Sequence, residues 1–202
     1  MTSRTKAFIT IGVGMIVILL VAWQFILPRL QPHVFYGQVI QSTSPAPTIE
    51  LDGPGGERVA ISDFEDKVVV LYFGYTFCPD VCPISLAKLA RAREMMGDKG
   101  DDVQVIMVSV DPARDTWQVL EEYAAHFDET FIGLTGDPAD IDRIATVYGV
   151  YYEAEESTSS AGYLVNHTST VMVVDRNGEL KLVIPYEATD EQVAADLSYL
   201  VG

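Results

Sequence analysis

Residues 68–90 read VVVLYFGYTFCPDVCPISLAKLA, a stretch in which a strand pattern passes into a helical one. The first six residues are apolar and rich in β-branched side chains, which is typical of a central strand buried on both faces of a sheet. Apolar residues then recur at helical spacing through residues 84–96, and a second apolar, β-branched run occupies residues 103–110. Strand, helix and strand in this order predict a βαβ unit whose two strands pair in parallel.

Shorter patterns extend this unit in both directions. A Gly-rich segment between residues 49–51 and 59–61 predicts a hairpin ahead of the unit, and residues 34–40 could add a short strand. The remaining elements that we predict are helices at 116–127, 138–148 and 189–200, a short strand at 131–134, a mobile polar loop at 153–162, and a hairpin of strands 170–174 and 180–184. Their order predicts an α/β, thioredoxin-like fold with an added N-terminal β-hairpin, preceded by a single transmembrane helix.

The transmembrane helix is predicted at residues 7–27, which contain no charged side chain. A helix of this length reaches roughly 31 Å, enough to cross the hydrocarbon core of a membrane. Arg4 and Lys6 precede it, so the positive-inside rule places residues 1–6 in the cytoplasm and the rest outside. A cleaved signal peptide is the alternative, but the run does not end in a small-x-small site. With no room for a transit peptide, we expect the bacterial cytoplasmic membrane, with the C-terminal domain on its periplasmic or extracytoplasmic side.

Beyond this anchor we expect a tether at residues 28–47, which contain four prolines, and a thioredoxin-like domain at residues 48–202. All 29 acidic residues follow the anchor, and this part of the chain carries a net charge of about −18. Binding to phosphate requires the opposite sign, so nucleic acid is excluded as a natural partner. The acidic surface suits docking to a basic protein surface or simply keeps the domain soluble, and charge alone does not decide between these.

Cys78 and Cys82 are the only two cysteines, and a proline follows each of them. Because a residue before proline disfavours the helical region, the pair cannot both lie inside a regular helix. We predict that the helix begins at Pro83, with Cys82 at its N-terminus and Cys78 in the preceding loop, where the positive helix end stabilises thiolates. Such thiolates can bind a soft metal or exchange disulfides, although the Cys-x3-Cys spacing is not that of a typical exchanger. Two inert buried cysteines are the third interpretation.

His167 is the strongest candidate for a third metal ligand. In a thioredoxin-like topology, the loop before strand 170–174 faces the cysteine loop. Two thiolates and an imidazole make a trigonal site suited to Cu(I), and a weaker additional ligand would accommodate Cu(II). Structural zinc would usually take a fourth protein ligand. We expect His126, at a helix end, and His33, in the tether, to be structural or solvated.

Three carboxylates lie near this site in the predicted fold. Asp80, between the cysteines, either accepts a hydrogen bond or carries a proton beside the ligands, or it is a solvated turn residue. Asp111 and Asp115 follow the second buried strand at its carboxyl end, where α/β sheets place functional loops. For Asp115, capping of the next helix is the interpretation that we favour over a chemical role.

Four motifs together resemble the Sco/SenC family over about residues 35–202: FGYTFCPDVCP at 73–83, VDPARDT at 110–116, GLTG at 133–136 and His167-Thr168. The resemblance implies a membrane-tethered, thioredoxin-like copper protein that assists assembly of the dinuclear copper centre in cytochrome c oxidase subunit II. It also implies Cys78, Cys82 and His167 as copper ligands, with subunit II and a copper donor protein as partners. The family commonly has Asp before this histidine, whereas this chain has Asn166. We expect the difference to alter hydrogen bonding or copper affinity but not the set of ligands.

Three functions therefore stay open. Copper delivery would make the protein a metallochaperone rather than an enzyme. A thiol-disulfide reductase would use Cys78 and Cys82 as catalytic residues to keep the copper-binding cysteines of the client reduced. The third function is that of a redox or copper sensor.

Overall fold

The computed structural model describes residues 3–25, 33–41, 44–156 and 162–202, which fall into two compact units, residues 1–34 and 35–202. In the first unit, helix α1 spans Ser3–Phe25. None of the helices in the described part of the chain is both long and apolar enough to cross a membrane. Residues 26–27 of the predicted anchor and 28–32 and 42–43 of the predicted tether lie outside the described residues.

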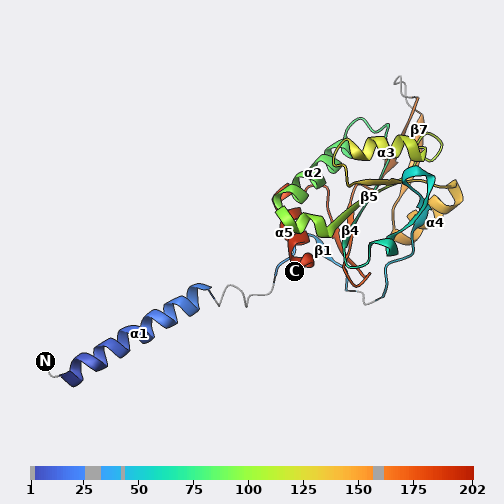
Figure 1. Cartoon of the computed structure of the whole chain (residues 1–202). Coiled ribbons are helices and arrows are strands. Elements are labelled where there is room, and N and C mark those ends of the chain that lie inside the picture. Colours follow the sequence, from blue (N-terminus) through green and yellow to red (C-terminus); the bar gives the residue numbers. More distant parts are fainter. Residues whose placement is uncertain (1–2, 26–32, 42–43, 157–161) are drawn as a thin grey trace. The chain divides into compact units, whose positions relative to one another are not determined.

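The second unit is built on one six-stranded sheet with strand order β1-β10-β9-β4-β5-β6 (Figure 1). Its strands are β1 (Gln38–Val39), β4 (Val68–Gly74), β5 (Val103–Ser109), β6 (Ile132–Leu134), β9 (Val171–Val174) and β10 (Leu180–Ile184). β4 pairs in parallel with β5 and antiparallel with β9, and every residue of β4 and β5 is buried. The predicted βαβ unit and the hairpin of β9 and β10 are therefore confirmed.

Four helices accompany the sheet: α2 (Val81–Met95), α3 (Trp117–Ala125), α4 (Pro138–Tyr148) and α5 (Asp190–Val201). Figure 1 shows α2 and α5 on one side of the central strands and α4 on the other. Thr116 caps α3 by accepting a hydrogen bond from the Val119 N–H, and Thr189 caps α5 in the same way. The described residues of this unit also contain three short 3-10 helices: Pro54–Gly56, Ile61–Phe64 and Gly97–Asp102.

Helix α2 begins two residues earlier than predicted, at Val81 rather than Pro83. The first four N–H groups of a helix have no partner within it, so the missing N–H of proline costs nothing at the third position. Cys82 therefore lies inside the first turn, whereas Cys78 stays in the loop before it. The expectation that the two cysteines do not share a helix is confirmed.

Two small hairpins flank the sheet. β2 (Glu50–Asp52) pairs with β3 (Arg58–Ala60), as predicted. β7 (Tyr152–Glu156) pairs with β8 (Tyr163–His167), so the prediction of a polar loop at 153–162 was wrong for residues 153–156, while 157–161 lie outside the described residues. Four of the five side chains of β7 are exposed, and the strand is held by backbone pairing that its polar composition does not reveal.

Part of the range predicted as a tether lies on the folded domain. β1 pairs with β10, in agreement with the short strand predicted within residues 34–40. The buried carboxylate of Asp196 in α5 accepts hydrogen bonds from the N–H groups of Tyr36, at 3.1 Å, and Gly37, at 2.8 Å. Further along, the Ala46 N–H donates to the Gly178 carbonyl oxygen at 2.7 Å.

Candidate metal centre

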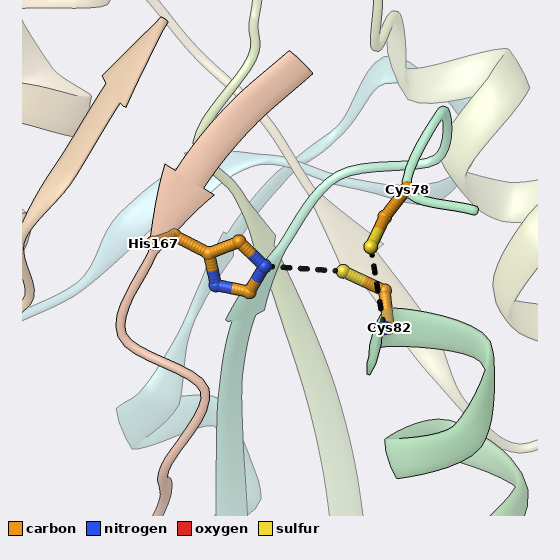
Figure 2. Close-up of side chains that lie close together, drawn as sticks. All are labelled: Cys78, Cys82 and His167. Carbon is orange, nitrogen blue, oxygen red and sulfur yellow. Dashed lines mark hydrogen bonds between the residues drawn. The ribbon is translucent and has the colours of Figure 1, made fainter. Parts of the chain in front are cut away.

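Three side chains from separate elements meet at the carboxyl end of β4. Cys78 lies in the loop after β4, Cys82 is the second residue of α2, and His167 is the last residue of β8. The candidate ligand atoms of all three lie within 4.8 Å of one another. Figure 2 shows the imidazole ring pointing at the Cys82 sulfur, with Nε2 3.3 Å from Sγ. The structure therefore brings together the three ligands predicted from the sequence.

A backbone contact selects the form of the His167 ring. Nδ1 lies 3.0 Å from the carbonyl oxygen of Thr168. A carbonyl oxygen can only accept a hydrogen bond, so Nδ1 must carry the proton and donate it. In the neutral ring this leaves the lone pair on Nε2, which faces Cys82. The imidazole is thus held in the tautomer and orientation that a metal ligand needs.

The two cysteines are free thiols, and they titrate very differently. The hydrogen bond with Cys82 lowers the pKa of Cys78 to about 3; burial opposes this shift, and His167 adds to it. The Cys82 N–H at the start of α2 also donates to the Cys78 sulfur at 3.4 Å. The same thiol contact and burial raise the pKa of Cys82. At neutral pH and without metal, Cys78 is therefore a thiolate and Cys82 keeps its proton.

Aromatic rings and a glycine shape the space around the ligands. The rings of Tyr72 and Tyr75 stand edge-on to His167, with centroids 6.2 and 5.8 Å from the imidazole. A Cβ at Gly74 would lie 3.0 Å from the Cys82 sulfur and 2.7 Å from the Tyr72 ring. Real Cβ atoms essentially never approach another atom within 3.0 Å, so a side chain at position 74 would displace the Tyr72 ring, and it would also crowd the Cys82 sulfur.

The ligand set fits a soft metal ion. Two thiolate sulfurs and one imidazole nitrogen make a trigonal set suited to Cu(I). Within the described residues, no aspartate or glutamate joins the cluster, whereas a structural zinc site usually has four protein ligands. His126, the C-cap residue of α3, also lies outside it.

The three predicted carboxylates are placed differently. Asp80 is the exposed N-cap residue of α2, and its side chain makes no capping hydrogen bond. Asp111 is buried and accepts hydrogen bonds from Arg114 and Tyr163. The expectation for Asp115 was wrong, because Thr116 caps α3 and Asp115 is fully buried under the cysteine loop.

Asp115 connects that loop to the sheet. Its carboxylate accepts hydrogen bonds from the Thr76 N–H at 3.1 Å, the Thr76 hydroxyl at 2.6 Å and the Ser109 hydroxyl at 2.7 Å. Burial raises the pKa of Asp115, although these hydrogen bonds oppose the rise. Thr76 precedes Cys78 by two residues, so this contact supports the path of the chain into the site.

Asn166, which replaces the aspartate common in the resembling family, has an exposed side chain. Neighbouring residues of a strand point to opposite faces, so Asn166 points away from the face that carries His167. Among the residues that sequence reasoning did not assign to the site are Gly74, Tyr75 and Arg114. They all lie within or beside the quoted motifs, but their contacts follow from the fold rather than from their spacing.

The fold and the cluster define a thioredoxin-like protein with a Cys2His cluster that can hold a metal ion. The model of the family described as SCO1/SenC matches residues 45–202, so the chain belongs to that family.

Curated relatives and solved structures agree with this assignment. The chain is 45% identical over 114 residues to "Protein SCO1 homolog 1, mitochondrial" of Arabidopsis thaliana, covering 56% of this chain and 34% of that protein. It is 34% identical over 131 residues to a SCO2-like protein of Rickettsia felis, covering 64% of each. The chain thus spans less than two thirds of the length of either relative.

Two solved structures are also similar. ScoI of Bradyrhizobium japonicum with copper bound has a TM-score of 0.70 and 35% identity, covering 77% of this chain and 99% of that one. BsSco, described as a member of the Sco family of cytochrome c oxidase assembly proteins, has a TM-score of 0.60 and 20% identity, covering 81% and 98%. The second comparison supports the fold alone.

Proposed function

We propose that this protein is a membrane-anchored copper chaperone that binds copper through Cys78, Cys82 and His167 and assists assembly of the dinuclear copper centre of cytochrome c oxidase subunit II. The observation that carries the proposal is the convergence of two sulfurs and the Nε2 of a correctly oriented imidazole within 4.8 Å. The copper-bound ScoI relative supports copper as the metal.

The site has the properties of a delivery site. Copper would displace the single proton that the thiol pair retains, and both sulfurs would then act as thiolates. A three-ligand set suits Cu(I), and an additional weak ligand would accommodate Cu(II). His167 is only partly buried, so incoming thiolates of a client protein can reach the site from its side and replace the ligands one at a time. A separate copper donor protein would load the site.

The anchor and the location belong to the same proposal. Residues 7–27 lack charged side chains, and α1 exposes large apolar side chains such as Ile16, Leu19 and Leu20. With Arg4 and Lys6 ahead of this run, the chain would cross the bacterial cytoplasmic membrane once and present its domain on the extracytoplasmic side, and the anchor would hold the site near its oxidase client.

A second function, thiol-disulfide reduction of client cysteines, is favoured by one observation. The lowered pKa of Cys78 makes this thiol a thiolate at neutral pH, and a thiolate is the attacking species in disulfide exchange. This function requires Cys78 and Cys82 but not His167.

Copper binding to the reduced, full-length protein tests the ligand assignment. We expect one copper per chain, and we expect His167→Ala to lower the affinity by at least about tenfold, which is about 1.4 kcal/mol. His126→Ala is the matched control, because it removes an imidazole that lies outside the cluster. Wild-type affinity in the His167→Ala variant would overturn the assignment.

Complementation separates delivery from reduction. Cells that lack this protein would be given the wild type, Cys78→Ser or His167→Ala, and oxidase activity would be measured with and without added copper. Delivery predicts that both variants fail and that copper rescues them. Retained activity in the His167→Ala variant would instead favour reduction.

A further inference from the structure

The hairpin that carries His167 is not paired with the main sheet. Among the described strands, β7 and β8 form a separate two-stranded sheet, whereas both cysteines follow a central strand of the six-stranded sheet. Backbone pairing restrains the histidine only at a distance, through Val171, which follows it by four residues and pairs with Tyr72 of β4. Side-chain contacts between the hairpin and the cysteine side of the site add a second, direct restraint on this distance.

Arg114 makes side-chain contacts both with the hairpin and with the loop that carries Cys78. Its side chain is 16% exposed, and its guanidinium lies 3.7 Å from the centre of the Tyr163 ring, in the hairpin, and 4.7 Å from that of Phe77, beside Cys78. Nη1 donates a hydrogen bond to the Tyr163 carbonyl oxygen at 3.0 Å. One planar cation thus contacts the cysteine loop and the hairpin together.

Asp111 anchors this arrangement to the end of β5. Its carboxylate accepts a hydrogen bond from Arg114 Nε and another, at 2.6 Å, from the Tyr163 hydroxyl. Asp111 is itself buried, and its N–H donates to the Ser109 hydroxyl at 3.0 Å. The carboxylate, the guanidinium and the phenol form a closed cluster with one member in the hairpin and two at the end of the sheet.

The cluster of Asp111, Arg114 and Tyr163 is also linked to the metal ligand His167. Tyr163 and His167 lie four residues apart on β8, so they share one face of the strand at a separation of about 13 Å. Tyr75 lies between the two groups, with its ring centre 5.8 Å from the Arg114 guanidinium and 5.8 Å from the imidazole. Displacement of Arg114 would therefore change the packing against His167 as well as the position of its strand.

We propose that Arg114, held by Asp111 and Tyr163, is a positioning residue that sets the distance between His167 and the two cysteine sulfurs. The inference rests on the proposed metal binding and adds what determines the geometry of that site. Arg114 acts on the site through the hairpin and through Tyr75 and Phe77. A lysine cannot replace it, because an ammonium group lacks the planar fork that bonds a carboxylate and a carbonyl while stacking on a ring.

The test uses the full-length, reduced protein with copper as the probe. We expect Arg114→Gln to lower Cu(I) affinity about tenfold in competition with a chelator, and to weaken the nitrogen hyperfine signal of the Cu(II) form towards that of His167→Ala. Arg114→Lys should show the same spectral change. Arg143→Gln is the matched control, because Arg143 forms an exposed ion pair with Asp140 and should leave affinity and spectrum unchanged.

The outcomes separate the two proposals. Absence of copper binding by the wild type would overturn the proposed function itself. Wild-type affinity and spectrum in a folded Arg114→Gln variant would overturn only the positioning role. If that variant does not fold, Tyr163→Phe decides the question, because it keeps Arg114 and the ring but removes the hydrogen bond to Asp111. A loss of affinity of about threefold with a shifted spectrum supports the proposal, and wild-type behaviour overturns it.

Discussion

The buried carboxylate of Asp115 supplies a stringent test of how the cysteine loop is supported. In Asp115→Ala, three donors lose their acceptor: the Thr76 N–H, the Thr76 hydroxyl and the Ser109 hydroxyl. Leaving one buried donor unsatisfied costs about 1–3 kcal/mol. Because the hydroxyls can rotate towards other partners, we expect a total loss of about 3–6 kcal/mol, a large share of the stability of an ordinary domain.

Asp115→Asn should cost far less, about 1 kcal/mol. The amide oxygen can take the place of Oδ2, which accepts from the Thr76 N–H and from Ser109. The amide nitrogen then faces the Thr76 hydroxyl, which can turn and accept. Urea unfolding of the reduced, metal-free protein, followed by circular dichroism, measures both variants. Equal losses for Ala and Asn, or a loss below about 1 kcal/mol for Ala, would refute this account of the hydrogen bonds.

The difference in unfolding free energy between the wild type and Asp115→Asn should depend on pH. The pKa of Asp115 is raised by burial, so the folded-state pKa lies above the unfolded-state value. A raised pKa contributes stability at low pH, and this contribution is lost as the pH rises through the folded-state pKa. The stability advantage of the wild type over Asp115→Asn should therefore shrink between about pH 4 and neutrality. A constant difference over this range would contradict the raised pKa.

Three further predictions concern the site and the acid stability of the domain. Gly74→Ala should lower copper affinity at least about tenfold in chelator competition, since its Cβ would displace the Tyr72 ring that packs against His167 and would crowd the Cys82 sulfur; unchanged affinity would contradict this steric account. Burial acts to raise the pKa of Asp128, but hydrogen bonds from Thr130 and a nearby arginine outweigh it and lower the pKa. Asp128→Asn should thus cost about 1 kcal/mol in unfolding free energy at pH 7 and progressively less as the pH falls below about 4, and a cost that does not change with pH would be inconsistent with this linkage. Because the pKa of Cys78 is about 3, alkylation of this thiol, followed by mass spectrometry, should proceed almost as fast at pH 5 as at pH 8, whereas an ordinary thiol would slow by orders of magnitude.

The fold was predictable where apolar pattern and local capping agree. The buried run at 68–73 became β4, and the helix predicted at 138–148 became α4 with the same bounds. β7 escaped prediction because its stability comes from pairing with β8 and not from burial of its own side chains. Residue type and chain order predict a strand well only when the strand has a buried face.

The set of three candidate metal ligands was predictable for a chemical reason. Cysteine and histidine are the ligand types of soft metals, and the topology brings the end of β8, which carries His167, to the two cysteines. The supporting contacts were not predictable in the same way. Asp115 bonds to a residue 39 positions earlier, and Arg114 stacks on rings from two different elements, so neither contact leaves a regular spacing in the sequence.

The distance along the chain between the ligands has a consequence for folding. Cys82 and His167 are 85 residues apart, and closing a loop of that length costs on the order of 4 kcal/mol in chain entropy. In an unfolded or half-synthesised chain the two thiols are already close together, because only three residues separate them. The imidazole is then either not yet synthesised or far from them. The complete three-ligand site appears only after β8 has docked against the cysteine loop. Occupancy of all three ligands is thus a late event that reports a finished domain, and it then adds binding free energy to the stability of that folded state.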